Sequence, residues 1–287
     1  MQYDRAGEHY WDSVAALTDE RWGWKDMLDT FCSIEDHELG ASPVRGGDGP
    51  LSVHVTRDPE PLNDAVVEAA QAWGLPWTDD LNAHDGERIG YVPNTTKNGR
   101  RHSTARAFLS LAKKQPTVTH INHAHAAQVH FDGTRATGVE AIVKTHRRMF
   151  RARREIILCA GPIETPMLLE RSGIGQPEVL RQLGVTPVAE SPHVGEHAVE
   201  QRMFAYQWRI KEQLGYNQKL STKLSQLVAG AAWMMTRGGI ISTGGYDLAA
   251  FAKSHADLDV PDLFLMFTPH MLVSRARNSI QKSAEGF

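Results

Sequence analysis

The chain has 287 residues, of which 41% are hydrophobic and 23% are charged, and its formal net charge is -3 at neutral pH. This composition is typical of a globular protein and excludes a disordered chain, while the near-balanced charge gives no support for binding nucleic acid or anionic lipid. The longest apolar stretch, residues 227–235, is too short to span a bilayer. Two cysteines, Cys32 and Cys159, make no disulfide framework, and no leader segment is recognised, so we expect a reduced cytoplasmic setting.

The first hundred residues alternate short helices, loops and one strand. A helix is predicted from Lys25 to about Glu35, and the glycine-rich turn at 46–50 leads into a short strand, Leu51 to Val55. A second helix is predicted from Asp58-Pro59, because apolar residues recur at helical spacing, and Gly74 should end it. These apolar residues are Leu62, Val66, Ala69, Ala70 and Trp73. A third helix should begin at Ser103 or Thr104 and run through Leu111.

From Thr117 the apolar period changes to two, which predicts successive strands. The four predicted strands are Val118–Ile121, Ala126–Phe131, Gly138–Val143 and Met149–Leu158. Asp132-Gly133 is a hairpin-turn signal between the second strand and the third. Four histidines in this segment, His120, His123, His125 and His130, raise the alternative of a metal site, and His193 with His197, four residues apart, raise it separately. We predict no metal, because residues 120–130 contain no Asp or Glu to support the ligands and His193 and His197 are not on a helix that would align them.

The stretch from Glu155 to Gly175 predicts a strand, a sharp turn and a helix. Residues 156–160 are continuously apolar, which is typical of a strand covered on both faces in a parallel sheet. Thr165 can cap the following helix, and Gly173 can end it in the left-handed region. Ligands in open α/β sheets lie beyond the carboxyl ends of strands, so Cys159, Ala160 and Gly161 are candidate nucleotide contacts.

After residue 200 the pattern predicts an amphipathic helix and two strands. The helix is marked by apolar residues from Leu220 to Ala231 and should end at Gly238-Gly239. The strands are predicted within Ser242–Phe251 and Pro261–Phe267.

The motifs around Gly161 resemble the glucose-methanol-choline (GMC) family of flavin oxidoreductases. Gly161-Pro162, Thr165-Pro166, Leu168-Leu169 and Ser172–Gly175 fit the second signature of the family at every constrained position. The resemblance extends over nearly the whole chain. Further matching segments are DHELGASP at 36–43, GPLSV at 49–53, NGRRHSTARAFL at 98–109, LRQLGV at 180–185 and VGEH at 194–197.

The resemblance implies an α/β fold with two kinds of domain. One is a Rossmann-like FAD-binding domain, incomplete here, with a β-meander, and the other is a substrate domain built on an antiparallel sheet with helices. The segments expected from the family are 1–50, which covers the flavin, 51–97 in the substrate domain, 98–195 in the FAD domain and 196–287 in the substrate domain. Met1 to Arg5 resemble the end of the first signature, so the family's dinucleotide fingerprint would lie before Met1 and its catalytic His beyond Phe287.

The resemblance also implies roles for particular residues. Met1 and Tyr3 belong to a flavin-contacting segment, and Ala126 occupies the position whose backbone meets the adenine. The remaining predicted cofactor contacts are Cys159, Ala160, Gly161 and Thr165. Phe251, Phe264 and Phe267 are candidates for lining the alcohol pocket, and no catalytic residue is assigned within the chain.

FAD-dependent oxidation of a primary or secondary alcohol is the activity that the resemblance implies, as in choline dehydrogenases. Two alternatives stay open: a cyanohydrin lyase of the same family, and a truncated, non-catalytic product that does not bind FAD. The sequence does not identify the alcohol, the electron acceptor or the oligomeric state.

Overall fold

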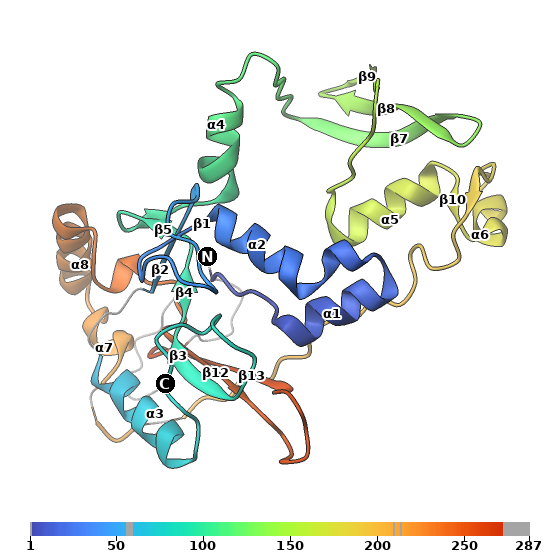
Figure 1. Ribbon diagram of the computed structural model, residues 1–287. Helices are drawn as coiled ribbons and strands as arrows, with labels where there is room; N and C mark the ends of the chain where they lie inside the picture. Colours follow the sequence, from blue (N-terminus) through green and yellow to red (C-terminus); the bar gives the residue numbers. More distant parts are fainter. Residues whose placement is uncertain (1, 56–59, 209, 213, 272–287) are drawn as a thin grey trace. The chain divides into compact units, whose positions relative to one another are not determined.

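The computed structural model describes residues 2–55, 60–208, 210–212 and 214–271 (Figure 1). The chain divides into two compact units, Met1–Gln115 with Ala205–Phe287, and Pro116–Phe204. The second unit lies mostly within the predicted FAD-domain segment 98–195, whereas residues 98–115 belong to the first unit. Each unit is described by itself.

The first unit combines helices with small sheets. Its helices are α1 (Glu8–Leu17), η1 (Glu20–Trp22), α2 (Trp24–Ile34), α3 (Pro61–Ala72), η2 (Ala105–Leu109), α4 (Ser110–Ala112), α7 (Tyr216–Lys219), α8 (Lys223–Thr236) and η3 (Ile240–Ser242). Its strands are β1 (Glu35–His37), β2 (Leu51–Val55), β3 (Arg88–Tyr91), β4 (Pro93–Asn94), β5 (Thr96–Lys97), β6 (Arg100–Arg101), β12 (Leu248–Ala252) and β13 (Leu263–Phe267). Strand β2 lies between β1, which is parallel to it, and β4, which is antiparallel.

The core of the first unit is built on the antiparallel sheet β13-β12-β3, which includes the two strands predicted after residue 200. Strand β12 is buried on both faces. One face carries Ala250 and Ala252, which pack with Ile89 and with residues of α3, and the other carries Ala249 beside Leu81. Because alanine side chains are small, α3 can pack close to the face that carries Ala250 and Ala252.

Most local predictions for the first unit are confirmed. Helix α2 and strand β2 have the predicted positions, and Gly74, at φ +108, ends the helix α3. The predicted start of that helix, Asp58-Pro59, lies outside the described residues. The helix predicted to begin at Ser103 or Thr104 is confirmed: the backbone oxygen of Ser103 accepts its first hydrogen bonds, and Thr104 makes no side-chain cap.

The second unit consists of a β-meander and two helices. Its elements are β7 (Ala124–Asp132), β8 (Arg135–Val143), β9 (His146–Arg151), α5 (Gly161–Arg171), β10 (Ile174–Gly175), α6 (Pro177–Gln182) and β11 (Ala189–Glu190). The hairpin turn is confirmed, since Gly133 adopts φ +57 between the paired residues Asp132 and Arg135. The predicted strand at 118–121 is wrong, because no described segment pairs with it.

The predicted buried strand at 156–160 is also wrong. These residues are irregular, and the side chain of Ile157 is 77% exposed. A continuous apolar run forms a parallel strand only when neighbouring strands satisfy its backbone groups, and no described segment pairs with this run. Helix α5 begins at Gly161, so Thr165 is its fifth residue, and the Thr165 hydroxyl accepts a hydrogen bond from the Ala160 N–H at 3.1 Å.

Gly173 ends α5 at φ +89, as predicted, and it is required for a second reason. A Cβ there would lie 2.6 Å from the Thr186 carbonyl oxygen and 2.9 Å from Val188 Cγ2. We expect Gly173→Ala to cost about 2 to 5 kcal/mol, the sum of left-handed strain and overpacking. Gly184→Ala is the matched control, because Gly184 adopts φ +71 with open space around it and should cost only about 1 to 2 kcal/mol.

Hydrogen exchange measures this difference within the second unit. The amides of Val188 and Ala189 both donate to the Gly173 carbonyl, at 2.7 and 3.2 Å. Their protection should fall more in Gly173→Ala than in Gly184→Ala. Equal losses in the two variants would show that no collision occurs at Gly173.

Candidate functional site

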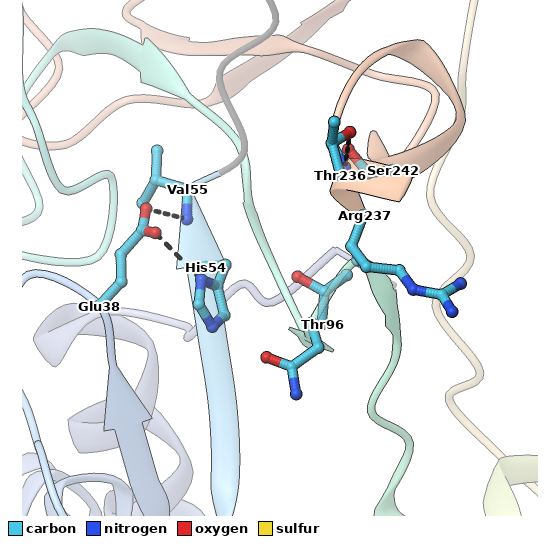
Figure 2. Close-up of a pocket in the computed structure, with 10 residues that line it drawn as sticks. Glu38, His54, Val55, Thr96, Thr236, Arg237 and Ser242 are labelled. Carbon is cyan, nitrogen blue, oxygen red and sulfur yellow. Dashed lines mark hydrogen bonds and ion pairs between the residues drawn. The ribbon is translucent and has the colours of Figure 1, made fainter. Parts of the chain in front are cut away.

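A polar pocket of about 660 Å³ lies in the first unit, beside β2, the β5–β6 hairpin and the carboxyl end of α8. Figure 2 shows Glu38 next to His54 and Val55, with Thr96 and Arg237 across from them. The lining residues are Glu38, His54, Val55, Thr96, Asn98, Gly99, Thr236, Arg237, Gly238 and Ser242. Most of these side chains are polar, and the volume suits a small ligand.

Glu38 and His54 form an ion pair on one wall of this pocket. Glu38 Oε2 lies 3.0 Å from His54 Nδ1, and Glu38 Oε1 accepts a hydrogen bond of 2.5 Å from the Val55 N–H. The hydrogen bond to Glu38 raises the pKa of His54. Burial opposes ionisation of Glu38, but the hydrogen bonds from His54 and Val55 outweigh it and lower the pKa of Glu38. Both carboxylate oxygens of Glu38 are therefore occupied.

Arg237 forms the opposite wall and ends α8 in the left-handed conformation, at φ +60. Its guanidinium lies 4.5 Å from the centre of the Trp233 ring, and Trp233 Nε1 donates to the Gly99 carbonyl at 2.9 Å. Gly99 is required here, because a Cβ would lie 1.9 Å from the Arg237 carbonyl oxygen. Arg237 Nη1 is buried and has no hydrogen-bond partner among the described residues.

A second polar cluster surrounds Asp247, which is 3% exposed and directly precedes β12. Its Oδ2 accepts hydrogen bonds from the Tyr216 hydroxyl at 2.5 Å and from Asn63 Nδ2 at 2.9 Å. Its Oδ1 has no partner among the described residues. The nearby His270 stacks on Tyr216 with ring centres 6.3 Å apart, and burial lowers the pKa of His270 although Asp247 partly opposes this. A neutral imidazole does not balance the charge of Asp247.

Of the two residues predicted at the N-terminus, Met1 lies outside the described residues and Tyr3 is engaged inside the first unit. The Tyr3 hydroxyl donates to Glu35 Oε1 at 2.6 Å. Burial, together with the Glu35 carboxylate, raises the pKa of Tyr3 far above its usual value. The contact of this segment with a flavin stays a prediction.

The three phenylalanines predicted to line one pocket do not share a face of their sheet. Phe251 and Phe264 are paired with ring centres 4.8 Å apart, and the Arg88 guanidinium lies 3.9 Å from the centre of the Phe251 ring. Phe267 packs on the α3 side, where it lines an apolar hollow of about 330 Å³ with Trp73 and Leu265 among others. Successive side chains of a strand point to opposite faces of the sheet. Residues 264 and 267 are three positions apart in β13, so their side chains lie on opposite faces.

The predicted FAD contacts of the second unit do not enclose a dinucleotide by themselves. Cys159, Ala160 and Gly161 are exposed, and the Ala160 N–H already donates to Thr165. Gly161 adopts φ +91 with no atom within 4 Å of where a Cβ would lie, and Ala126 is half-buried in β7 opposite Ala141. The described residues of the second unit thus do not form a closed FAD site by themselves, and we assign no reaction step through the flavin. Their roles as cofactor contacts stay predictions.

The histidines form one close pair in the second unit, where His193 Nδ1 lies 3.1 Å from His197 Nε2. Within the described part of the chain, no three His, Cys, Asp or Glu side chains are grouped to hold a metal ion. In the same residues, none of the helices combines the length and the apolar character that crossing a membrane requires.

Sequence reasoning missed the residues of both polar sites. Asn98-Gly99 and Gly238-Gly239 are visible turn signals, but nothing local indicates that they meet Glu38 and His54. Asp247 belongs to a segment predicted to be strand and shows no pattern of its own. Each site joins residues that are far apart in the sequence, such as Asn63 and Asp247.

Comparisons with known proteins define the class of the chain. The family model for GMC oxidoreductases matches residues 4–201. The chain is 34% identical over 287 residues to the oxygen-dependent choline dehydrogenase of Pseudomonas fluorescens (strain SBW25), covering 98% of this chain and 50% of that protein. It is 36% identical over 275 residues to the same-named protein of Paraburkholderia xenovorans (strain LB400), covering 94% and 48%. The chain spans about half the length of these relatives.

Solved structures agree with this class. Pyridoxine 4-oxidase from Mesorbium loti matches with a TM-score of 0.62 and 31% identity, over 67% of this chain and 38% of that chain. A variant of the formate oxidase of Aspergillus oryzae RIB40, from work on its FAD modification, matches with a TM-score of 0.82 over 99% of this chain and 55% of that chain; at 18% identity it shows the fold alone. The class is that of GMC oxidoreductases with a mixed α/β fold, as the motifs predicted. The chain belongs to the GMC oxidoreductase family.

Proposed function

We propose that the chain forms the alcohol-binding part of an FAD-dependent oxidoreductase that acts on a CH–OH group, and that its substrate is a quaternary ammonium alcohol of the choline type. The identity of about a third to proteins named oxygen-dependent choline dehydrogenase, over nearly the whole chain, supports the class of reaction. FAD, when bound, supplies the electron acceptor for such an oxidation. The residues of this chain are assigned only to binding the alcohol.

We choose a cationic alcohol because one carboxylate oxygen of the buried Asp247 has no partner within the described part of the chain. A buried carboxylate is costly unless a cation or hydrogen bonds compensate it, and Asp247 Oδ1 has neither among the described residues. The ring of Tyr216 adjoins this carboxylate, with His270 stacked on it and the Lys219 ammonium 5.7 Å from its centre, and quaternary ammonium groups bind to aromatic faces and carboxylates. A choline-type headgroup would complete the charge balance at this position.

Choline and its neutral isostere 3,3-dimethylbutan-1-ol test this assignment without any flavin. They share size and hydroxyl group, and they differ by one charge. We expect choline to shift the tryptophan fluorescence or the NMR spectrum of the chain at concentrations about tenfold or more below those that the neutral alcohol requires, a difference of about 1.4 kcal/mol or more.

Asp247→Asn should abolish this preference, because it keeps the shape and removes the charge. Asp262→Asn is the matched control, since Asp262 is bonded to Ser254 at the surface and should leave the preference unchanged. Equal binding of both alcohols by the unmodified chain would exclude a cationic substrate at Asp247.

Cyanohydrin cleavage is the alternative that the family resemblance leaves open. Cyanide released from mandelonitrile, in place of flavin reduction by an alcohol, would identify it. The second alternative, a chain that does not hold FAD, is supported by the exposure of Ile157 and of residues 159–161.

A further inference from the structure

We propose that the open edge of strand β9 binds an acidic, extended segment of a partner protein, which adds to the β-meander as a further strand. In the sheet β7-β8-β9 of the second unit, β9 pairs with β8 along one side and forms an edge of the sheet along the other (Figure 1). This surface goes beyond the proposed alcohol binding, because the residues assigned to the alcohol lie in the first unit.

The backbone groups of alternate β9 residues point away from the sheet. The Ala152 N–H, directly after the strand, donates to the Thr137 carbonyl oxygen at 2.9 Å. Bonded and non-bonded pairs alternate along an antiparallel ladder, so the even-numbered residues of β9 also bond to β8. The odd-numbered residues, Arg147, Met149 and Arg151, direct their N–H and C=O groups to the edge. Within the described residues no other segment bonds to these groups, and such a row is a template for an added strand.

The opposite edge of the sheet, β7, is covered by the end of α5. The Val129 N–H donates to the Ser172 hydroxyl at 2.8 Å, and Arg171 Nε donates to the Ala127 carbonyl oxygen at 3.3 Å. Strand β9 has no corresponding contacts in the part of the chain that the structure describes. The edge at which the sheet can accept a further strand is therefore that of β9.

The exposed side chains along this edge are strongly basic. Residues 144–154 contain no Asp or Glu. Among the described residues, Arg147 is the one cation of this segment that pairs with a carboxylate, that of Glu140. Arg148 lies over the Phe150 ring, 5.3 Å from its centre. The cations of the segment, all exposed, are Lys144, Arg147, Arg148, Arg151, Arg153 and Arg154. Most of their charge is therefore uncompensated.

These charges determine which strand can pair with the edge. Cross-strand pairs of opposite charge stabilise a sheet, whereas like charges directly opposite each other destabilise it. Pairing with β9 of a second copy would bring arginines together, so this edge resists pairing with itself. A strand with acidic side chains would instead place carboxylates beside Arg148 on one face and beside Arg147 and Arg151 on the other. The edge therefore selects an acidic segment.

An acidic peptide fits this edge better than a nucleic acid or an anionic membrane. The outward groups of β9 include carbonyl oxygens, which need hydrogen-bond donors. A peptide backbone supplies donors and acceptors, whereas ionised phosphates supply acceptors alone. The net charge of -3 opposes the approach of a long polyanion, while a short segment responds mainly to the charges within a Debye length.

Fluorescence anisotropy with labelled peptides tests the edge on the 287-residue chain. The probe is a short peptide in which Glu alternates with Thr. One control peptide has Gln in place of Glu, and the other carries N-methyl groups on two adjacent central residues, one for each edge of the peptide strand. The acidic peptide should bind with about tenfold or higher affinity than the Gln peptide, because several cross-strand charge pairs form. N-methylation should weaken binding about tenfold or more, because it removes a backbone hydrogen bond and places a methyl group against β9.

Each comparison has an outcome that contradicts the proposal. Equal binding of the N-methylated peptide would exclude strand addition, and equal binding of the Gln peptide would exclude an acidic partner. A labelled oligothymidylate and phosphatidylserine vesicles are the alternative probes. If either bound more tightly than the acidic peptide, the edge would be a phosphate-binding surface and the proposal would be wrong.

Charge reversal on β9 locates the binding. Arg148→Glu and Arg151→Glu should each weaken binding of the acidic peptide about threefold or more. Arg181→Glu is the matched control, because Arg181 is exposed on α6 of the same unit and pairs with Glu178 there. Unchanged affinity in both β9 variants would overturn the proposal.

Met149→Pro tests the backbone of the edge without changing its charge. It removes an outward N–H, and proline is compatible with an edge strand at a position whose N–H faces solvent. The variant should bind the acidic peptide as weakly as the unmodified chain binds the N-methylated peptide, with the amide NMR signals of β8 retained. If the substitution disturbs the meander, the N-methylated peptide on the unmodified chain decides between strand addition and attraction by charge alone.

Discussion

Glu35→Ala should destabilise the first unit by about 3 to 5 kcal/mol, because removing one partner of a buried ion pair leaves the other charge uncompensated. Arg5 Nη1 lies 3.2 Å from Glu35 Oε1, and both side chains are only 1% exposed. The same carboxylate accepts hydrogen bonds from the Tyr3 hydroxyl and, at 3.1 Å, from the Gly46 N–H. Glu35 thus joins the N-terminal segment to α2 and to the turn before β2.

Tryptophan fluorescence in urea is the measurement, because all seven tryptophans lie in the first unit. The expected loss is a large share of the roughly 5 to 15 kcal/mol that stabilises a typical domain, so the urea midpoint should fall steeply. Tyr3→Phe removes only one hydrogen bond and should cost about 1 to 2 kcal/mol.

The double variant Arg5→Met with Glu35→Met distinguishes the contribution of the whole ion pair from the cost of leaving one charge buried without its partner. Replacing a buried pair by apolar side chains of similar volume is often neutral or stabilising, so the double variant should be more stable than Glu35→Ala. If the double variant were as unstable as Glu35→Ala, the hydrogen bonds to Tyr3 and Gly46 would be the main contribution, and the ion-pair account would be wrong.

Local patterns predicted the elements whose stability depends on their own residues and near neighbours. The helical spacing of 62–73 and the alternation of 126–143 were visible in the sequence, and α3, β7 and β8 follow them. Turn residues were equally informative, since Gly74, Gly133 and Gly173 adopt the positive φ angles for which they were singled out. These features arise from sterics within a few residues.

Sequence patterns gave wrong or no predictions where the local structure depends on residues that are distant in the sequence. The run at 156–160 was assigned to a strand on apolarity alone, but a strand needs paired neighbours. The sequence did not predict the two polar sites for the same reason. Glu38 contacts His54 because β1 pairs with β2, and Asp247 contacts Asn63, which is 184 residues away in the sequence. Family motifs supplied the class of enzyme, and only the structure supplied these contacts.

Purified 287-residue chain should be colourless, with less than about one tenth of an equivalent of FAD, and should self-associate. A dinucleotide site uses backbone N–H groups at the end of a paired strand and the start of a helix. Here the preceding residues are irregular, and the first available N–H, that of Ala160, is bonded to Thr165. Ile157 and Ile163 lie exposed on either side of this turn, and each large apolar side chain in water forgoes about 1.5 to 3 kcal/mol of burial energy.

Absorption at 450 nm and size-exclusion chromatography with light scattering measure both expectations. Ile157→Lys provides the sharper test, because it distinguishes an exposed turn from a buried strand. In the exposed conformation the substitution should leave the unfolding midpoint within the equivalent of about 0.5 kcal/mol and reduce self-association. Leu168→Lys, at a position only 2% exposed on α5, is the buried counterpart and should unfold the second unit.

The opposite pattern would identify a complete flavin site. A yellow, monodisperse chain with one FAD, in which Ile157→Lys is as damaging as Leu168→Lys, would mean that residues 156–160 form a covered strand in solution and that Cys159 to Gly161 meet the nucleotide. Reduction of that flavin by choline would then extend the proposed function from alcohol binding to the whole reaction. A colourless chain in which Ile157→Lys is tolerated would instead limit the function of these 287 residues to binding the alcohol.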